Sequence, residues 1–247
     1  MHNMLYLFLF ITRYDEDPIM KTGAVIVAAG LSSRMGAFKP MLPFGSETII
    51  RHNALSLLNA GCSPVCVVTG FQSELLKDHL SDLPVLCIEN PDYRTTQMFD
   101  SVKIGLAAVT DSCDRILLTP GDACAYKSST VNALLDSEAD ICIPVFNGKR
   151  GHPIMISGKV IPFIVSYMGE GGLGGALASL TSLSPDQAGT LSSSAAMRTA
   201  DQSAALPASA SGQRSLVTEL PVNDPGILLD ADTPEDYKKL TEYAEGL

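Results

Sequence analysis

The sequence predicts a three-layer α/β/α protein built around a mostly parallel central sheet. Apolar runs typical of buried strands alternate along the chain with amphipathic segments that suit helices. Polar residues and glycines gather where these apolar runs end, as in open sheets that bind ligands at the carboxyl edge of their strands. With 247 residues the chain is long enough for a sizeable core. We therefore expect a single domain over residues 21–247.

The first half of the chain is a regular succession of strands and helices. Each expected strand is a nearly continuous apolar run, as in parallel sheets that are covered on both faces. Gly61 follows the first helical segment, in the position where helices often end on a left-handed residue. The expected strands are 24–29 (AVIVAA), 64–70 (PVCVVTG), 84–90 (PVLCIEN) and 115–122 (RILLTPGD), and the expected helices are 47–61, 72–80, 96–109 and 128–137.

The second half departs from this alternation. The turn NGKRG separates two apolar strands, which predicts a hairpin. Residues 184–214 are rich in Ser and Ala and poor in large apolar residues, so we expect a disordered insertion there. Near the C-terminus Thr233 is a plausible helix N-cap and Pro234 suits the first helical position. The expected elements are strands 139–146, 153–157, 215–222 and 226–232, and helices beginning within 169–180 and at Thr233.

The charge balance restricts the partners. The formal net charge is −10, which argues against nucleic-acid binding because that needs a basic surface. A phosphate-binding loop in such an acidic chain would serve a small phosphorylated ligand. We expect no nucleic-acid partner.

The six cysteines are an even number, but most lie within apolar runs, where cysteine acts as a small hydrophobic residue. The sequence has no CxxC pair and no Cys/His set with zinc-type spacing. Reduced thiols and a cytoplasmic location are therefore expected.

The N-terminal residues 1–20 are interpreted as a non-domain extension. Their apolar stretch, Met4 to Ile11, is about half of the ~20 residues that cross a bilayer. A basic segment before it and a small-residue cleavage site after it, which signal peptides have, are both missing. We expect no membrane attachment.

The loop after the first strand carries glycines and cations suited to phosphate. It fits neither GxxxxGK[ST] nor GxGxxG. Gly30 and Gly36 nevertheless let backbone N–H groups approach an anion. Arg34 offers a forked donor and Lys39 a point charge, which suits a polyphosphate. The alternative from these residues alone is a solvated surface turn.

Carboxylates follow two of the expected strands. Asp122 ends the strand RILLTPGD, and Asp230 and Asp232 end the strand GILLDAD. Mg²⁺ typically binds one or two carboxylates together with substrate phosphates. We expect Asp230 and Asp232 to face opposite sides of the chain, so that only one of them joins Asp122 at one ion. The alternative is that these carboxylates only cap the segments that follow.

The turn NGKRGHP combines Lys149, Arg150 and His152. A basic turn of this kind could hold a second anionic substrate. His152 could act as a general base, although an isolated histidine is more often structural.

Four motifs occur in one order: VIVAAGLSSRMG with Lys39, GD after an apolar strand, GKRGHP, and DADTPEDY. Together they resemble the nucleotidyltransferases of the molybdenum-cofactor cytidylyltransferase type, which belong to the superfamily of GT-A-like nucleotidyltransferases. The resemblance spans roughly residues 23–247, interrupted by the Ser/Ala-rich segment. It implies a GT-A-like fold with a Rossmann-like nucleotide-binding half.

This resemblance also implies an activity and a site. CMP would pass from CTP to molybdopterin with release of diphosphate and with Mg²⁺ as cofactor, and the protein would make transient contact with a molybdoenzyme. Asp122 and Asp232 would bind the metal, and Arg34, Lys39 and Asp122 would be catalytic. The sequence AAG resembles the cytidylyl branch, since the guanylyl branch usually has AGG. The implied ligand-binding residues are Ala28, Ala29, Gly30, Ser32, Ser33, Arg34, Gly36, Lys39, Gly70, Asp100, Ser101, Gly121, Arg150 and His152.

Two departures from the family pattern fall near the expected site. GDACAY replaces a sequence that usually contains proline, and QMFDS, residues 97–101, stands where many members have Gly-Met-Ser-Ser. Two alternatives therefore remain open. One is a sugar- or polyol-phosphate cytidylyl- or uridylyltransferase, and the other is a non-catalytic NTP-binding maturation factor for a molybdenum enzyme.

Overall fold

The computed structural model describes residues 20–32, 35–181 and 216–245. The expectations for residues 1–19 and for the insertion 184–214 lie outside the described residues, and the single domain stays a prediction. The strands are β1 (Thr22–Ala28), β2 (Pro43–Phe44), β3 (Glu47–Thr48), β4 (Val65–Thr69), β5 (Val85–Glu89), β6 (Arg115–Pro120), β7 (Ile141–Phe146), β8 (Lys149–Arg150), β9 (Ile154–Ser157) and β10 (Val217–Pro221).

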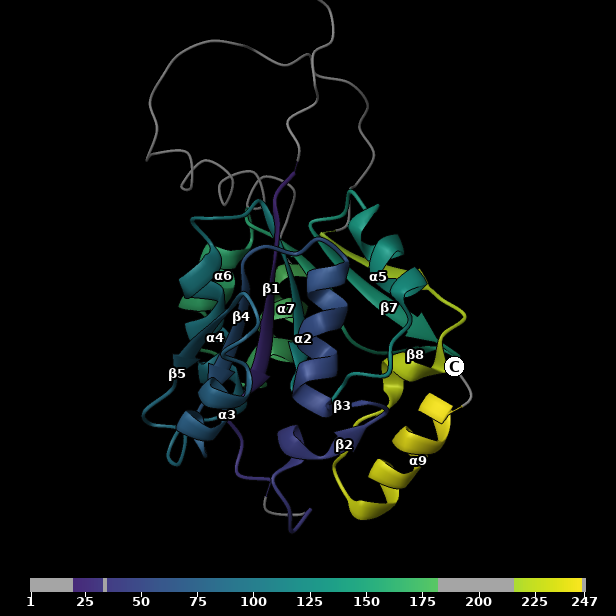
Figure 1. The fold of residues 1–247 in the computed structure, drawn as a ribbon. Coiled ribbons are helices and arrows are strands. Elements are labelled where there is room, and N and C mark those ends of the chain that lie inside the picture. Colours follow the sequence, from purple (N-terminus) through teal and green to yellow (C-terminus); the bar gives the residue numbers. More distant parts are fainter. Residues whose placement is uncertain (1–19, 33–34, 182–215, 246–247) are drawn as a thin grey trace, which may run out of the picture.

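Along the chain the helices lie between these strands and one more ends the described chain, and Figure 1 shows them beside the sheet. The α-helices are α2 (Ile49–Asn59), α3 (Ser73–His79), α4 (Met98–Val109), α5 (Ser128–Leu135), α6 (Ile161–Ser166), α7 (Gly172–Thr181) and α9 (Pro234–Glu245), and two short 3₁₀ helices are η1 (Lys39–Met41) and η3 (Pro225–Leu228).

The main sheet has eight strands in the order β10-β7-β9-β6-β1-β4-β5, with β8 paired to β7. Strands β6, β1, β4 and β5 are mutually parallel, as in a Rossmann-like half. Strand β9 runs antiparallel to both β6 and β7. The predicted fold class, an α/β protein with a mostly parallel central sheet, is confirmed.

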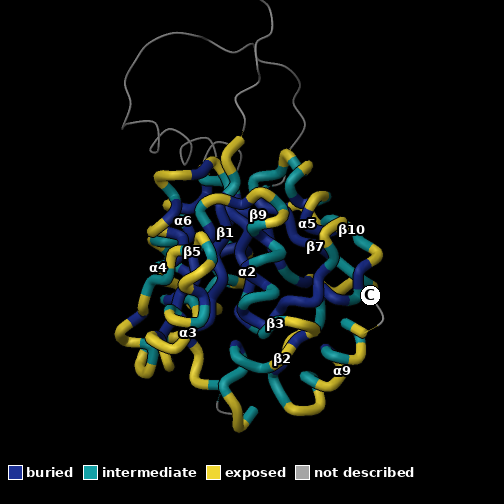
Figure 2. The backbone as a smooth tube through the Cα atoms, viewed as in Figure 1, coloured by how far each residue is buried: buried dark blue, intermediate teal, exposed yellow. Residues whose placement is uncertain are grey.

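The core divides into two layers, one on each face of the sheet. Strand β1 shows this division, because Val25 and Val27 belong to one buried cluster and Ala24, Ile26 and Ala28 belong to the other. Side chains of a strand alternate between its faces, so β1 contributes to both layers. The tube in Figure 2 is dark blue along the sheet, which marks β1 and its neighbours as the most buried part of the chain. This burial explains why the strands read as continuous apolar runs.

The predicted hairpin is present, and its turn chemistry explains it. Asn147 and Gly148 have φ angles of 50° and 74°, the left-handed values of the Asn-Gly turn that joins two-residue hairpins. β7 then pairs antiparallel with β8. The chain continues into β9, which inserts between β7 and β6 and completes the sheet.

The predicted strand at 226–232 is wrong. Residues 225–228 form η3, and the chain from Leu229 to Asp232 has no strand pairing. Asp224 ends the preceding segment by accepting hydrogen bonds from Gly226 N and from Lys127 N, which bends the chain away from the sheet. The predicted cap of the last helix is confirmed, because Thr233 Oγ1 accepts from the N–H of Asp236.

Gly105 lies where α4 crosses the sheet and gives a test of the packing. A Cβ at this position would lie 2.8 Å from Val68 Cγ2 and closer still to Val25 Cγ1. We expect Gly105→Ala to lower the free energy of unfolding by about 1–3 kcal/mol, although alanine is the better helix former. Urea denaturation would measure the change.

Gly174→Ala on α7 is the matched control, because a Cβ there would meet nothing within 4 Å. This variant should be neutral or more stable by up to about 1 kcal/mol. Equal effects of the two substitutions would contradict the close packing of α4 on β1 and β4.

Candidate active site

A pocket of about 500 Å³ lies at the carboxyl ends of β1 and β6. Its walls come from the loop after β1, from the start of η1, from the segment between β5 and α4, from the Gly-Asp turn after β6 and from the segment before α9. Open parallel sheets bind ligands at this edge. The carboxyl-edge location expected from the sequence is therefore where the pocket is found.

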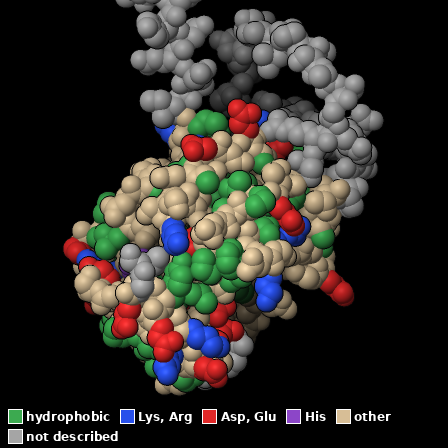
Figure 3. Space-filling model, turned by 90° about the vertical axis from the view of Figure 1, so that its right-hand side faces the viewer, with side chains coloured by type: hydrophobic (Ala, Val, Ile, Leu, Met, Phe, Trp, Pro, Cys, Tyr) green, Lys and Arg blue, Asp and Glu red, His purple; other side chains and the backbone are tan. Residues whose placement is uncertain are grey.

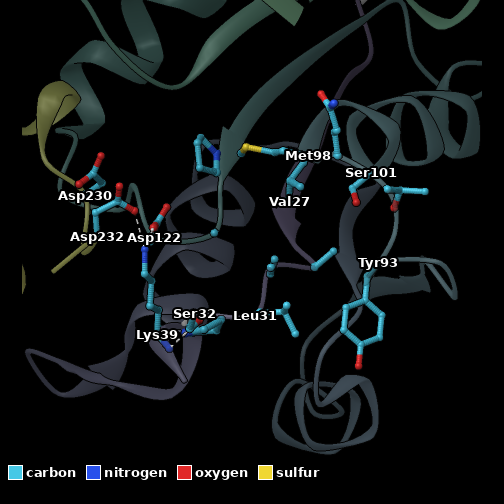
Figure 4. A pocket seen from close by; sticks show the side chains of 18 residues that line it. Val27, Leu31, Ser32, Lys39, Tyr93, Met98, Ser101, Asp122, Asp230 and Asp232 are labelled. Carbon is cyan, nitrogen blue, oxygen red and sulfur yellow. Dashed lines mark hydrogen bonds and ion pairs between the residues drawn. The ribbon is translucent and has the colours of Figure 1, made fainter. Parts of the chain in front are cut away.

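One end of the pocket is charged, and a single lysine joins its carboxylates. Lys39 Nζ lies 3.0 Å from Asp122 Oδ2 and 2.6 Å from Asp232 Oδ1. Asp230 lines the same end, and Figure 4 shows the three aspartates grouped around the lysine. The Lys39 side chain is only 12% exposed, so these contacts are screened less than surface ion pairs are.

The pKa values at this end follow from the contacts. Burial lowers the pKa of the Lys39 ammonium, but the hydrogen bonds and charges of Asp232 and Asp122 outweigh it, so the pKa is raised. Burial, followed by the negative charges of Asp122 and Asp232, raises the pKa of Asp230. Lys39 is therefore a fixed cation at neutral pH, and Asp230 is a carboxylate beside two others.

Local backbone geometry explains how Lys39 reaches this place. Ser32 has a φ of 53°, and its hydroxyl accepts a hydrogen bond of 3.2 Å from the N–H of Lys39. Pro40 follows directly in the first turn of η1, where proline is tolerated. The hydrogen bond from Lys39 to Ser32 thus joins the two ends of the loop, and the lysine side chain projects toward Asp122 after β6.

The Gly-Asp turn is held from behind by a buried asparagine. Asn53 of α2 is fully buried, and its Nδ2 donates to the carbonyls of Pro120 and Ala123, which flank Asp122 in sequence. The Oδ1 atom of Asn53 accepts from the hydroxyl of Tyr126 at 2.6 Å. Every hydrogen-bonding group of this amide except one lone pair is used, so Asn53 fixes both sides of the aspartate.

Gly121 allows the turn to lie against β1. A Cβ at this position would be 2.9 Å from the Cβ of Ala28, and the N–H of Gly121 donates to the carbonyl of Val27. A larger residue would push Asp122 away from the first loop. The glycine therefore sets the distance between the carboxylate and Lys39.

The other end of the pocket is uncharged. Leu31, Tyr93, Met98 and Ser101 line it and lie across from the charged group in Figure 4. The loop that carries Tyr93 packs closely on the loop after β4. The pocket thus offers an apolar and hydroxyl-bearing end beside a cation and three carboxylates.

The pocket brings together nine of the residues expected from the sequence. They come from four separate segments, which the motifs had located without showing that these segments meet. These residues are Ala28, Ala29, Gly30, Ser32, Lys39, Ser101, Gly121, Asp122 and Asp232. Their roles in binding and catalysis stay predictions.

Other expected residues lie elsewhere. Ser33 and Arg34 are outside the described residues. Gly36 is on the same loop with a φ of 69° but does not line the pocket. Gly70 lies behind the pocket, where a Cβ would be 2.7 Å from the Cβ of Tyr93. Asp100 caps α4 by accepting from the N–H of Gln97.

The basic turn is also separate from the pocket lining. Arg150 on β8 pairs with Glu219 at 2.7 Å. His152 follows it, and burial lowers its pKa although the charge of Asp122 opposes this effect. Its Nδ1 atom is buried and has no hydrogen-bond partner. A role for these two residues stays a prediction.

The sequence analysis named Asp230 but left it out of the implied metal pair, and it missed the uncharged wall. Asp230 was expected to face away from Asp232 because both were expected on a strand. That expectation was wrong, because side chains two residues apart in a strand point to the same face, and both carboxylates line one pocket. That Leu31, Tyr93 and Met98 line one pocket had no sequence signal, because it depends on how distant segments meet.

The donor set fits a hard divalent cation. Carboxylate oxygens are the ligands that Mg²⁺ prefers, usually one or two of them with substrate phosphates. Asp122 and Asp232 already share a cation, the ammonium of Lys39. No group of three or more His, Cys, Asp or Glu side chains with the geometry of a metal site is present in the described part of the chain.

The surface carries charges of both signs. Figure 3 shows Lys and Arg side chains scattered among Asp and Glu on the face it presents, with apolar side chains between them. Among the described residues, no helix is both long enough and apolar enough to cross a bilayer.

The fold and the pocket define a nucleotide-binding α/β protein, and comparison with known proteins identifies its family. The model of the MobA-like NTP transferase domain matches residues 24–187. The chain belongs to this family and is a nucleotidyltransferase. The resemblance inferred from the motifs is thereby confirmed.

Two curated relatives match over more than half of the chain. "Molybdenum cofactor cytidylyltransferase" of Escherichia coli (strain K12) is 37% identical over 136 residues, which are 54% of this chain and 68% of the relative. "Nicotine blue oxidoreductase" of Paenarthrobacter nicotinovorans is 28% identical over 162 residues, 62% of this chain and 78% of the relative. These two relatives are thus named for two different activities.

Solved structures show the same fold. A nucleotidyl transferase from Methanothermobacter thermautotroptrophicus aligns with a TM-score of 0.69 at 20% identity, over 92% of this chain and 98% of that one. A protein of Mycobacterium tuberculosis H37Rv, solved as a complex with manganese, aligns with a TM-score of 0.63 at 21% identity, over 90% and 98% of the two chains.

The raised pKa of Asp230 predicts a pH-dependent effect of its removal. Because the folded-state pKa lies above the unfolded value of 3.8, the ionised carboxylate costs stability above the folded pKa, and this cost disappears as the pH falls toward 3.8. We expect Asp230→Asn to be more stable than the parent protein at pH 7, by less than about 1 kcal/mol because the residue is exposed. Urea denaturation at pH 7 and pH 4 would measure it.

Asp78→Asn, an exposed carboxylate on α3, is the control for a general effect of lowering the negative charge. It should change stability less than Asp230→Asn does at pH 7. A stability gain for Asp230→Asn that is the same at both pH values would contradict charge repulsion as its cause.

Proposed function

We propose that this protein is a Mg²⁺-dependent nucleotidyltransferase that transfers CMP from CTP to molybdopterin and releases diphosphate. The observation that carries this proposal is the ammonium of Lys39 between Asp122 and Asp232 at the edge of the pocket. A cation beside two carboxylates suits a triphosphate and its metal ion. The cytidylyl assignment rests on AAG at residues 28–30 and on the relative named for that activity.

The two ends of the pocket suit the two parts of a nucleoside triphosphate. The uncharged end, with Leu31, Tyr93 and Ser101, suits a base and its sugar. The charged end suits the phosphates, which Lys39 would neutralise as a point charge. N–H groups of the loop after β1 would donate to phosphate oxygens in the same region.

Asp122 and Asp232 would hold the magnesium ion, which would act as a Lewis acid on the phosphate oxygens when bound. With the ion in place, Lys39 would exchange its carboxylate partners for the phosphates. Asp230, beside the other two carboxylates, would add to the negative field that draws the ion into this end of the pocket.

The chain's own residues would promote the reaction by position and charge. A terminal phosphate oxygen of molybdopterin attacks the α-phosphorus, the bond to the β-phosphate oxygen breaks, and diphosphate leaves. No protein nucleophile is required. Lys39 and Arg34 would neutralise the charge that grows on the oxygens, and fixed groups of this kind need no reorganisation during the step.

The remaining roles belong to the same proposal. Arg150 and His152, on the turn next to the Gly-Asp segment, would contact the molybdopterin side. The described cysteines are all free, which suits the reducing cytoplasm, where the product would pass to a molybdoenzyme by transient contact.

A diphosphate-release assay tests the substrate assignment. With Mg²⁺ and molybdopterin, we expect release from CTP to exceed release from GTP by at least about tenfold, and chelation of the metal with EDTA to stop it. Release of diphosphate with a sugar or polyol phosphate, but not with molybdopterin, would show that the acceptor is a sugar or polyol phosphate and not molybdopterin. Mg²⁺-dependent CTP binding without release for any acceptor would make the protein a non-catalytic binding factor.

Two substitutions test the charged end directly. We expect Lys39→Met and Asp122→Asn each to lower the turnover number by about 10²–10³, the usual loss when one stabilising group is removed from such a site. Circular dichroism would establish that the fold is kept. Lys77→Met, which removes an exposed lysine of α3 paired with Glu74, should leave turnover unchanged. Near-normal turnover in either site variant would overturn the assignment.

A further inference from the structure

Asn90 is a buried polar residue that no motif predicted. It lies directly after β5 and is 1% exposed. Its Nδ2 atom donates two hydrogen bonds of 3.0 Å, to Thr96 Oγ1 and to Ser101 Oγ. Both acceptors line the uncharged end of the pocket. One buried amide therefore contacts two hydroxyl groups of the pocket wall.

The orientation of this amide is unambiguous. Asn90 Oδ1 accepts a hydrogen bond of 3.0 Å from the backbone N–H of Asp92. A backbone N–H can only donate, so the oxygen must be on that side and the NH₂ group must face the hydroxyls. The usual uncertainty about asparagine flips does not arise here.

The amide consequently fixes the direction of the hydroxyl groups. Each hydroxyl accepts from Asn90, so each must direct its own proton elsewhere. Thr96 donates its proton to the carbonyl of Asp92 at 2.9 Å. For Ser101, which is 3% exposed, no acceptor is within hydrogen-bond range among the residues that the structure describes. Its proton is therefore left for a group inside the pocket.

We propose that Asn90 forces the Ser101 hydroxyl to donate its hydrogen bond into the pocket. There the hydroxyl would select a nucleobase that has an acceptor atom on the edge facing it. The inference rests on the proposed function, which puts a pyrimidine base at this end of the pocket. Cytosine presents two acceptors on the relevant edge, O2 and N3, whereas uracil presents O2 and an N3–H donor. Asn90 is a positioning residue, because it acts on the ligand only through Ser101.

Asn90→Asp is a nearly isosteric substitution that tests the direction of the Ser101 hydrogen bond. The aspartate keeps an oxygen for the N–H of Asp92 but has no donor for Ser101. The Ser101 hydroxyl must then donate to the aspartate and present its lone pairs to the pocket. We expect the dissociation constant of CTP to rise about tenfold, the usual effect of one buried donor without a partner.

Two further variants keep the test decisive if the aspartate impairs folding. Ser101→Ala removes the donor itself and should weaken CTP binding to a similar extent. Thr130→Val is the matched control, because it removes a buried hydroxyl that donates to Asp224 at 2.6 Å outside the pocket. It should lower stability without changing the affinity for CTP.

The measurement is isothermal titration calorimetry with Mg²⁺ and three probes: CTP, UTP and inorganic tripolyphosphate. Tripolyphosphate has no base, so its affinity should be the same for the parent protein and the Asn90 and Ser101 variants. A gain of UTP relative to CTP in Asn90→Asp would support the inference and identify N3 as the acceptor. An equal loss for both nucleotides would support it with O2 as the acceptor.

Failure of the inference can be told apart from failure of the proposed function. If CTP and tripolyphosphate bind but CTP affinity is unchanged in Ser101→Ala, the inference is overturned and the proposed function stands. It is also overturned if tripolyphosphate binding weakens as much as CTP binding. If neither CTP nor tripolyphosphate binds the parent protein, the proposed function fails first.

Discussion

The ion pairs of Lys39 are the interaction on which the organisation of the site depends. Its ammonium joins Asp122, 83 residues away, and Asp232, 193 residues away. The loop after β1, the end of β6 and the segment before α9 therefore converge at one charge. Without this cation, three carboxylates would repel one another at the same end of the pocket. Burial together with the neighbouring carboxylates raises the pKa of Asp230, and the carboxylate partners raise that of Lys39 against the effect of burial.

The sheet explains why such distant segments can meet. Because β1 and β6 are parallel neighbours, the residues that follow them emerge at the same edge. Gly121 then allows the turn after β6 to approach Ala28 closely. The antiparallel β9 extends the sheet beyond β6, and β10 pairs with β7 at its end. The segment after β10 contributes Asp230 and Asp232 to the pocket. The fold fixes the location of the site before any functional side chain is considered.

The sequence predicted what depends on strong local patterns. The strands of the parallel half are buried on both faces, so continuous apolar runs located them, and Asn147-Gly148 located the hairpin by its backbone preference. GILLDAD has the same apolar character, but Asp224 bends the preceding chain and no strand forms. The expected separation of Asp230 from Asp232 was wrong for another reason, because residues two apart share a face in a strand as well. Tyr93, Met98 and Leu31 were missed because contact between loops leaves no periodic pattern in the sequence.

Two buried asparagines show how the geometry of the pocket is maintained behind its lining. Asn53 holds the carbonyls on both sides of Asp122 at the charged end, and Asn90 holds Thr96 and Ser101 at the uncharged end. An amide suits this task because it offers two donors and an acceptor in a fixed plane without a charge to desolvate. The carbonyls of Pro120 and Ala123 can only accept, which fixes the direction of the Asn53 amide, and the N–H of Asp92 can only donate, which fixes that of Asn90. Motifs thus identify the residues that would touch a ligand, while their directions are set by amides that carry no motif.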